Sequence, residues 1–357
     1  MKKALIAMSG GVDSSVAACL MKENGYSCIG VTMKLFQNEE IGLKREHTCC
    51  SLDDVEDARS VAYQLQIPYY VFNFSDCFQK CVIERFVSSY ENGITPNPCI
   101  DCNRYLKFDK LFQRARELEY DYVVTGHYAR VEYDAETERY LLKKALDPDK
   151  DQSYVLYAMT QEQLKHTLFP LGELTKPQVR KIAEKHALIN AQKHDSQDIC
   201  FVANGKYTDF IRQYTGKSYP EGDFIDCDGK VLGTHKGIIH YTIGQRKGLN
   251  ISSKVPLYVC AINPEKNTVT LGTNEQLYTK SLTAGHINMI SVPFLEKPAR
   301  LKVKVRYRHP EQWAVVTQVD ADTLHVEFEE PQRAVTRGQA VVLYDGDLVV
   351  GGGIIQG

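Results

Sequence analysis

Short apolar runs and amphipathic segments alternate over the first third of the chain. The apolar runs predict strands, and the segments with apolar residues three and four positions apart predict helices. The predicted strands are 3–8, 27–33, 69–74 and 122–125, and the predicted helices are 14–24, 53–66, 77–90 and 108–118. Segment 94–102 holds two prolines and is predicted to be a loop. This alternation indicates an α/β fold, with an open parallel sheet, helices on both faces and a ligand at the carboxyl ends of the strands.

The pattern changes near Tyr219 to glycines, turn residues and short runs in which apolar and polar residues alternate. These runs are 257–262, 268–271, 300–307, 313–319, 324–328 and 340–343. A period of two is typical of strands with one buried face, and the last four runs predict a small closed or nearly closed barrel. We therefore expect a first domain over 1–202, a small, mainly β central domain over 203–277 and a C-terminal β-barrel over 278–357.

The composition is that of an average globular protein, with 43% hydrophobic and 25% charged residues. The apolar stretch 4–8 is shorter than the roughly 7–15 residues of a secretory signal, and no run approaches the roughly 18 apolar residues of a membrane span. The cysteines, 11 in all, are expected to be reduced thiols, which favours a cytoplasmic protein without a membrane partner. Because the formal net charge is −2, nucleic-acid binding would depend on local basic patches.

A glycine-rich turn is the sharpest chemical signal in the sequence. Ser9-Gly10-Gly11-Val12-Asp13-Ser14-Ser15 follows the first predicted strand and opens the first predicted helix. Glycine lets the backbone approach a phosphate closely, and hydroxyl and N–H groups at a helix N-terminus donate hydrogen bonds to its oxygens. The turn is no Walker A loop, and the nearest match to one, Gly216-Lys217-Ser218, has Ile211 at the required glycine position. It is no dinucleotide-binding fingerprint either, because no G-x-G-x-x-G follows a strand. The turn therefore predicts a phosphate site of another type.

The same turn resembles the loop of the PP-loop ATP pyrophosphatases, which split ATP between its α and β phosphates and leave AMP on a substrate oxygen. The resemblance implies adenylation rather than phosphoryl transfer, with ATP and Mg2+ as expected ligands. It implies that ATP contacts Ala7, Met8, Ser9, Gly10, Gly11, Val12, Asp13, Ser14 and Met33, with Gly126 near the nucleotide. Asp13 is a candidate Mg2+ ligand, although a carboxylate at this position could equally cap the helix.

Longer motifs occur along the rest of the chain. Two contain cysteines, namely Thr95-Pro96-Asn97-Pro98-Cys99-Ile100-Asp101-Cys102-Asn103 and Asp195-Ser196-Gln197-Asp198-Ile199-Cys200-Phe201. Further motifs lie at 125–128, 150–154, 244–248 and 305–308. Together they resemble one family of this group over nearly the whole chain, the tRNA-specific 2-thiouridylases (MnmA or TrmU family). The resemblance implies that sulfur replaces the C2 oxygen of the wobble uridine (position 34) in tRNAs for Lys, Glu and Gln. It also implies a sulfur-relay protein or a cysteine desulfurase as partner.

The resemblance assigns the sulfur chemistry to two cysteines. ATP adenylates the C2 oxygen, a persulfide on Cys200 delivers sulfur to C2, and Cys102 completes release by forming a disulfide with Cys200. Sulfur attack needs a thiolate or persulfide anion, so we expect both thiols to ionise more readily than an ordinary cysteine. Other cysteines are expected to be small buried apolar residues, namely Cys19, Cys28, Cys77, Cys81, Cys227 and Cys260.

The resemblance also implies substrate contacts. Asn97, Pro98 and Cys99 are expected at the target base, and His127, Lys150, Asp151, Gln152, Arg306, Tyr307 and Gln339 at the tRNA. Cys99 departs from the better-known family members, which have aspartate there. A second hypothesis is therefore a [4Fe–4S] cluster on Cys99, Cys102 and Cys200 whose open iron carries the sulfur. The C-x-x-C pair could also be a redox couple.

A basic segment suggests a surface for RNA. Residues 297–308 contain six basic and no acidic residues. If this segment is a strand, Leu301, Val303, Val305 and Tyr307 would be buried, and Lys302, Lys304, Arg306 and Arg308 would point outward. An outward row of cations suits a phosphate backbone, although lysines also protect edge strands against aggregation. A second basic patch, Gln245-Arg246-Lys247-Gly248, could bind tRNA or be a solvated loop.

Two other classes of function stay open at this point. One is a PP-loop enzyme that amidates or ligates a small substrate, which would not need paired cysteines. The other is a zinc-stabilised RNA-binding module with Cys49, Cys50, Cys99 and Cys102 as ligands, although adjacent cysteines are poorly spaced for a tetrahedral site. Formation of AMP that depends on tRNA would separate the three classes.

Overall fold

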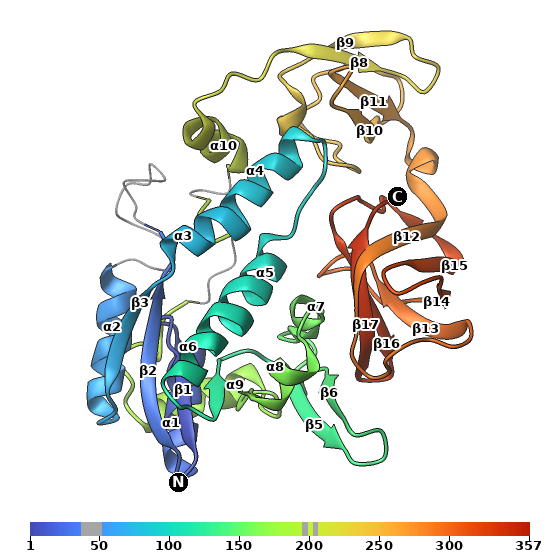
Figure 1. Cartoon of the computed structure of the whole chain (residues 1–357). Helices are drawn as coiled ribbons and strands as arrows, with labels where there is room; N and C mark the ends of the chain where they lie inside the picture. The colour runs from blue at the N-terminus through green and yellow to red at the C-terminus, as the bar shows by residue number, and fades with distance from the viewer. Residues whose placement is uncertain (37–51, 195–198, 203–205) are drawn as a thin grey trace.

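The computed structural model describes residues 1–36, 52–194, 199–202 and 206–357. The chain forms a parallel-sheet domain, a small β domain and a β-barrel (Figure 1). No helix among the described residues has the length and apolar character needed to cross a bilayer.

The first domain is built on a five-stranded parallel sheet. Its strands are β1 (Lys3–Ala7), β2 (Ser27–Lys34), β3 (Tyr69–Asn73), β4 (Tyr122–Val124) and β7 (Thr167–Leu168). The order is β3-β2-β1-β4-β7, and all four pairings are parallel. Because β1 lies in the middle, the loop that follows Ala7 opens at the centre of the carboxyl edge, where ligands bind in such sheets.

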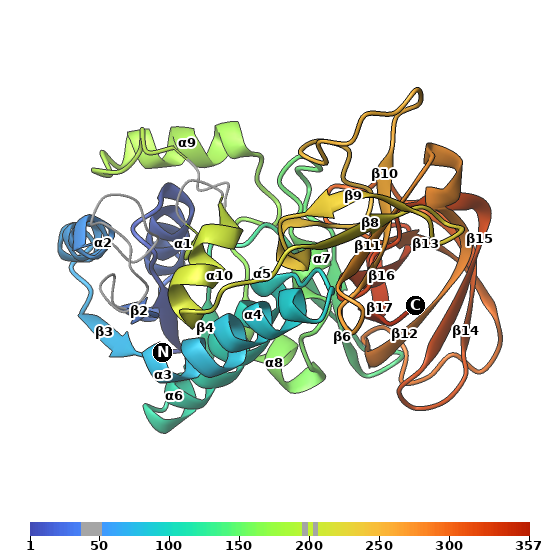
Figure 2. The same cartoon turned by 90° about the horizontal axis from the view of Figure 1, so that it is seen from above.

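Helices cover both faces of this sheet, as the alternating pattern predicted (Figure 2). Helices α1 (Val12–Glu23), α2 (Leu52–Gln64) and α9 (Lys176–Lys185) share one apolar core with the face of β1 that bears Ile6. Helix α6 (Leu111–Glu117) packs with Leu5 and Val123 on the other face. The α/β fold class is therefore confirmed.

Two longer helical stretches follow β3. The first comprises α3 (Ser75–Phe78), the π-helical segment η1 (Gln79–Ile83) and α4 (Glu84–Glu91), and the second comprises α5 (Pro98–Asp101), the π-helical segment η2 (Cys102–Lys110) and α6. The loop predicted for 94–102 is wrong beyond Asn97. Pro98 occupies the first turn of α5, where its missing N–H costs nothing, and the Asn97 side chain accepts a hydrogen bond from the Cys99 N–H.

The central part is mainly β, as expected. After α10 (Tyr207–Thr215) come β8 (Gly222–Ile225), β9 (Val231–His235), β10 (Tyr258–Asn263) and β11 (Thr268–Gly272). These strands form a sheet in the order β10-β11-β8-β9 and enclose a small core around Phe224, Val259 and Leu271.

The C-terminal part is a closed six-stranded barrel. Its strands are β12 (Tyr278–Met289), β13 (Ala299–Lys304), β14 (Gln312–Gln318), β15 (Leu324–Arg333), β16 (Ala340–Asp345) and β17 (Leu348–Ile355). They pair in the order β12-β15-β14-β13-β16-β17, and β12 pairs with β17 to close the barrel. Residues at alternate positions, such as Leu301 and Val303, fill the interior as the period of two predicted.

A hairpin from the first domain joins the barrel sheet. Strands β5 (Arg130–Asp134) and β6 (Arg139–Lys143) pair with each other, and Lys143 of β6 pairs with Leu348 of β17. Arg130 adds an ion pair to Asp347, with 2.6 Å between Nη2 and Oδ2. The short helices α7 (Ser153–Leu156) and α8 (Gln161–Lys165) follow this hairpin. The barrel is therefore attached to the side of the parallel-sheet domain through residues 130–143 (Figure 1).

Candidate functional site

The loop after β1 forms a tight turn into α1. Gly10 has a φ of +74°, and a Cβ on it would lie 2.3 Å from the carbonyl oxygen of Asp54. Gly11 is the N-cap of α1 with an ordinary φ of −88°, and a Cβ there would meet only the Ser9 hydroxyl at 3.5 Å. The Ser14 hydroxyl accepts a hydrogen bond from the Ser9 N–H at 3.2 Å and donates one to the Gly11 carbonyl at 3.0 Å. The turn itself thus requires glycine at Gly10, whereas Gly11 leaves space above the helix N-terminus.

Two segments hold the rest of the predicted nucleotide residues beside this loop. The Met8 carbonyl accepts a hydrogen bond from Thr32 at 2.7 Å, and Met33 lies half-buried next to it at the end of β2. A Cβ on Gly126 would lie 2.7 Å from the Ser14 nitrogen and 2.8 Å from the Asp13 carbonyl carbon. Gly126 therefore lets the segment after β4 pack directly on the start of α1.

Asp13 accepts hydrogen bonds from two side chains that come from distant parts of the chain. Lys176, at the start of α9, places Nζ 2.8 Å and 2.9 Å from the two carboxylate oxygens, and the Tyr128 hydroxyl donates to Oδ1 at 2.8 Å. The N-cap of α1 is Gly11 and Asp13 lies inside the first turn, so the capping alternative for Asp13 is wrong. The Lys176 side chain is only 11% exposed, which makes this a largely buried ion pair. The sequence analysis did not identify Lys176 or Tyr128 as site residues.

A further side chain fixes the phosphate loop from outside. The amide nitrogen of Asn190 donates to the Gly10 carbonyl at 3.0 Å and to the Ser15 hydroxyl at 2.8 Å. Asn190 is buried, and it follows α9 in the same stretch as Lys193, which pairs with Asp54 at 2.7 Å. The stretch after α9 thus holds the backbone at Gly10. Sequence reasoning missed this contact because nothing around Asn190 marks it apart from an ordinary loop.

His127 is buried beside this region. Its Nδ1 lies 2.7 Å from the Thr125 hydroxyl, and its Nε2 lies 3.4 Å from Lys107 Nζ. Burial lowers the pKa of His127 well below its ordinary value, and the nearby Lys107 charge lowers it further. The imidazole is therefore neutral and packed between Phe108 and Phe169. His127 is only 7% exposed. Its expected contact with tRNA stays a prediction.

The residues expected at the base and the tRNA meet where the barrel touches the start of α5. Gln339 donates from Nε2 to the carbonyls of Thr95 at 2.9 Å and Pro96 at 3.1 Å. The Tyr307 hydroxyl donates to the Asp151 carbonyl at 3.1 Å. Burial raises the pKa of Tyr307, and the neighbouring Asp151 and Cys99 raise it further. The barrel thus holds the segment that leads into Cys99.

Residues 150–152 connect this place to the phosphate loop. The Gln152 side chain accepts a hydrogen bond from the Tyr128 N–H at 2.9 Å, and the Tyr128 hydroxyl reaches Asp13. The Asp151 carboxylate accepts from the Ala145 N–H at 3.0 Å and from the Ser153 hydroxyl at 2.8 Å, so its side chain stabilises this turn. Lys150 is half-buried in the same turn. One path of contacts therefore runs from Asp13 through residues 128 and 150–152 to Tyr307 of the barrel.

The predicted outward row of four cations is wrong at Arg306. Strand β13 ends at Lys304, and Arg306 turns inward, where it donates to the Ala334 carbonyl and the Thr336 hydroxyl; burial lowers its pKa. Tyr307, expected inside, is 36% exposed. The edge-strand alternative is also wrong, because β13 pairs with both β14 and β16.

The other basic residues differ in exposure. Lys302 and Lys304 are half-buried, whereas Arg308 is exposed, and so are Arg246 and Lys247 in the turn at 245–248. Arg306 also donates to the Ile243 carbonyl at 3.4 Å, just before this turn. Arg306 thus links the two basic segments by holding the central domain against the barrel.

The cysteines expected to carry the chemistry lie near one core. Cys102 begins η2, and Cys200 lies just after residues 195–198; both are half-buried and pack against the apolar cluster that contains Phe86, Leu106 and Phe201. Cys99 is exposed, three residues before Cys102. Residues 195–198 of the second cysteine motif lie outside the described residues, as do Cys49 and Cys50.

The cysteines expected to be buried behave less uniformly. Cys19 and Cys28 are buried, whereas Cys77, Cys81 and Cys260 are half-buried. The prediction is wrong for Cys227, which is exposed, because it lies in the turn between β8 and β9 whose residues 227–230 are all exposed.

Comparison with known proteins divides the chain in the same way. Three family models match it: "tRNA methyl transferase HUP domain" at 2–204, "tRNA methyl transferase PRC-barrel domain" at 208–273 and "Aminomethyltransferase beta-barrel domain" at 279–355. The tRNA-specific 2-thiouridylase MnmA of Clostridioides difficile is 51% identical over 99% of this chain and 98% of its own length. The MnmA of Acetivibrio thermocellus is 52% identical over 99% of both chains.

The chain belongs to the MnmA family of tRNA-specific 2-thiouridylases. A third relative, MnmA 2 of Caldanaerobacter subterraneus subsp. tengcongensis, is 53% identical over 99% of this chain. The family models are described as methyl transferase domains, whereas these relatives are named thiouridylases. The relatives decide the family, because half of all positions agree with them over the full length. MnmA membership agrees with the two cysteine motifs, which methyl transfer would not explain.

Proposed function

We propose that this chain is a tRNA 2-thiouridylase, which uses ATP to replace the C2 oxygen of the wobble uridine with sulfur. The observation that carries this proposal is the path of hydrogen bonds from Asp13 through Tyr128, Gln152 and Asp151 to Tyr307 of the barrel. The barrel in turn holds the segment just before Cys99, because Gln339 donates to the carbonyls of Thr95 and Pro96. An enzyme that must activate an oxygen and then bring sulfur to the same carbon needs its phosphate loop and its cysteine motif held in a fixed arrangement.

The activation step falls to the loop after β1. N–H groups at the start of α1 would donate to the phosphate oxygens, and the Lys176 ammonium lies beside the same turn to stabilise negative charge. Attack of the uridine C2 oxygen on the α phosphorus would release pyrophosphate and leave AMP on that oxygen. The Asp13 carboxylate and the Ser14 hydroxyl are hard oxygen donors that fit Mg2+, which neutralises phosphate charge when it is bound.

The sulfur step falls to Cys200 and Cys102. The terminal sulfur of a Cys200 persulfide attacks C2, the C2–O bond breaks and AMP leaves with the former uridine oxygen. The Cys102 thiolate then attacks Sγ of Cys200, so the S–S bond to the base breaks, 2-thiouridine leaves, and a Cys102–Cys200 disulfide forms. Two electrons from a cellular thiol reductant restore the thiols, and a sulfur-relay protein or cysteine desulfurase reloads Cys200.

The three parts would then divide the work. Residues 1–202 form the catalytic domain, 203–277 a linker that binds tRNA, and 278–357 the barrel. We assign phosphate contacts to the exposed Arg246, Lys247 and Arg308, and base contacts to Asn97, Pro98 and Cys99. The tRNAs for Lys, Glu and Gln are the proposed substrates.

A second candidate differs only in the carrier of sulfur. Cys99 precedes Cys102 by three residues on one helix, and Cys102 shares a core with Cys200. Three thiolates of this kind fit a [4Fe–4S] cluster, which would supply an open iron for sulfide. Cys99→Ala separates the two routes. If a cluster is required, the variant loses both thiolation and cluster loading in anaerobic reconstitution. If no cluster is required, its thiolation with a persulfide donor stays largely intact.

The experiment that tests the proposed function is product analysis of ATP turnover. With tRNA containing an unmodified wobble uridine, we expect AMP and pyrophosphate, formed at a rate that depends on the tRNA. ADP as the product would contradict adenylation. AMP formation that is independent of tRNA and stimulated by ammonia or an amino acid would instead support an amidating or ligating enzyme.

A further inference from the structure

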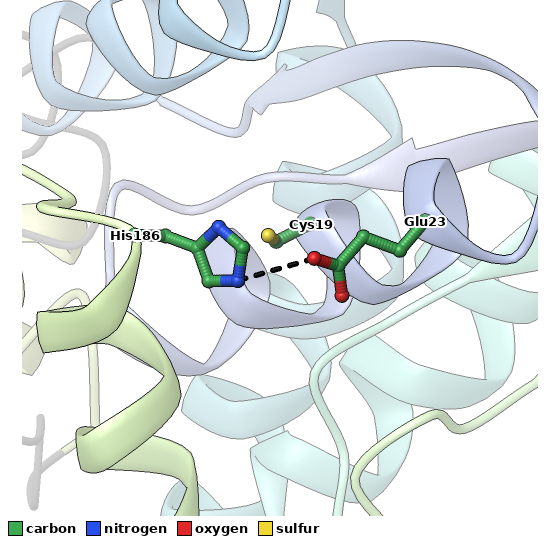
Figure 3. Close-up of side chains that lie close together, drawn as sticks. All are labelled: Cys19, Glu23 and His186. Carbon is green, nitrogen blue, oxygen red and sulfur yellow. Dashed lines mark ion pairs between the residues drawn. The ribbon is translucent and has the colours of Figure 1, made fainter.

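Three side chains with metal-binding atoms meet away from the proposed active site (Figure 3). Cys19 and Glu23 lie one turn apart on α1, and His186 is the C-cap residue of α9. The Cys19 Sγ, a Glu23 carboxylate oxygen and a His186 ring nitrogen all lie within 4.8 Å of one another. In Figure 3 the sulfur lies between the imidazole ring and the carboxylate.

One of the three separations is close to that of a tetrahedral zinc site, and the two that involve the sulfur are at most 4.8 Å. Zn2+ binds sulfur at about 2.3 Å and nitrogen or oxygen at about 2.0–2.2 Å, so its ligand atoms are separated by roughly 3.3–3.6 Å. The distance between His186 Nε2 and Glu23 Oε1 is 3.2 Å. Two ligands at positions i and i+4 of a helix face the same side, as in other helical zinc sites. Small side-chain rotations would therefore complete the geometry.

The surroundings suit an ion with three protein ligands. Cys19 is buried at 2% exposure, whereas the side chains of His186 and Glu23 are 24% and 51% exposed. The Cys19 sulfur would therefore contact the ion from the protein interior, and the side of the ion next to the Glu23 carboxylate would be open to water. The backbone of His186 is held independently, because Gln64 of α2 donates to its carbonyl at 2.6 Å.

We propose that Cys19, Glu23 and His186 form a Zn2+ site whose fourth position is taken by water. The ligand set of one thiolate, one imidazole and one carboxylate is chemistry that zinc accepts and that Mg2+ or Ca2+ does not. Burial and the Glu23 charge raise the pKa of the Cys19 thiol, so binding displaces a proton from sulfur.

The position of the site in the fold indicates a structural role. Helices α1 and α9 pack against each other, and Asp13 pairs with Lys176 at their first turns. Glu23 and His186 each follow those residues by ten positions, or about 15 Å along a helix. Zinc would therefore join α1 and α9 at the end opposite to the ion pair. It would hold Lys176 in place without touching substrate.

Cobalt titration tests the site directly. The whole protein is stripped of metal with a chelator under reducing conditions and titrated with Co2+, which reports thiolate ligation by charge-transfer absorption and tetrahedral geometry by its visible bands. We expect Cys19→Ser to bind one equivalent less than the wild type and Cys28→Ser, which removes another buried thiol, to match the wild type. Glu23→Gln and His186→Gln should weaken binding at least tenfold, with Zn2+ displacing Co2+.

The outcome that overturns the proposal is equal stoichiometry and identical spectra for the wild type and Cys19→Ser. If Cys19→Ser fails to fold, the two surface variants decide: unchanged cobalt affinity in both His186→Gln and Glu23→Gln also overturns it. The thermal midpoint gives a second readout, because Zn2+ should raise it in the wild type and in Cys28→Ser but not in His186→Gln.

Discussion

Lys176 and Asp13 are 163 residues apart in the sequence, yet the Lys176 ammonium contacts both carboxylate oxygens of Asp13, at 2.8 Å and 2.9 Å. The pair lies at the first turns of two neighbouring helices, at the mouth of the phosphate loop. Because the PP-loop has no lysine of the Walker type, Lys176 is a cation that the fold places beside the loop proposed to bind the phosphates.

Replacement of Lys176 by methionine should therefore slow ATP activation. We expect AMP formation to fall about 100-fold, the size of effect seen when one preorganised charge is removed from a transition state. Lys217→Met is the matched control, because it removes a lysine from an exposed ion pair with Glu91. Wild-type AMP formation by Lys176→Met would show that the pair only stabilises the fold.

The two glycines of the loop should respond differently to alanine. Gly10→Ala forces a left-handed backbone and a Cβ 2.3 Å from a backbone oxygen, so we expect a loss of at least about 2 kcal/mol in the free energy of unfolding. Gly11→Ala should leave stability nearly unchanged and weaken ATP use, because its Cβ would enter the space for phosphate. Denaturant unfolding and AMP formation measure the two effects. Equal stability losses in both variants would contradict this account.

The pH dependence of stability should reflect His127. The pKa of His127 is lowered well below 6.5 in the folded protein, so below pH 6.5 the unfolded chain binds a proton that the folded protein does not. The contribution of neutral His127 to the free energy of unfolding is complete above pH 6.5. It is lost as the pH falls toward the lowered pKa, by at most about 1.4 kcal/mol per pH unit. Denaturant unfolding at several pH values should show a shallower slope for His127→Gln. Identical slopes for the variant and the wild type would mean that His127 is solvated.

The basic segments should separate into tRNA contacts and a structural arginine. Neutralising Lys302 and Arg308 together should reduce the slope of log affinity for tRNA against log salt by about 0.7–0.9 for each phosphate that is no longer neutralised. Arg306→Gln should instead lower the free energy of unfolding by about 1–3 kcal/mol, because the Thr336 hydroxyl and the Ile243 carbonyl lose the donor that Arg306 supplies. Binding measured over a salt series, with melting curves for each variant, tests both. A changed slope only in Arg306→Gln would reverse the assignment.

The architecture of residues 1–125 was largely predictable because most strands and helices there have a clear period, whereas β5, β6, β7, α7, α8 and α9 of the same domain were not predicted. Apolar runs such as 3–8 and helical faces such as that of 14–24 specify which side is buried, and alternation then implies a parallel sheet. The start of α5 was missed because a proline at the first helical position looks like a loop residue in the sequence. Local pattern does not distinguish these two uses of proline.

Contacts between distant segments were not predictable. The period of a strand indicates which face is buried, but it does not show that β13 ends at Lys304, so Arg306 was expected to point outward. Likewise, nothing near Lys176 or Asn190 indicates that these side chains reach the phosphate loop. The predicted site residues from the loop, by contrast, follow from one short motif at a strand end.

The most direct test of the central claim is mass spectrometry of nucleosides from tRNA incubated with the enzyme, ATP and a persulfide donor. We predict a sulfur-for-oxygen mass change at the wobble uridine with the wild type and with Cys28→Ser, and none with Cys200→Ser or Cys102→Ser. Cys200→Ser should still form adenylated tRNA, which separates loss of sulfur transfer from loss of activation. Unmodified uridine from the wild type, or full 2-thiouridine from Cys200→Ser, would contradict the account.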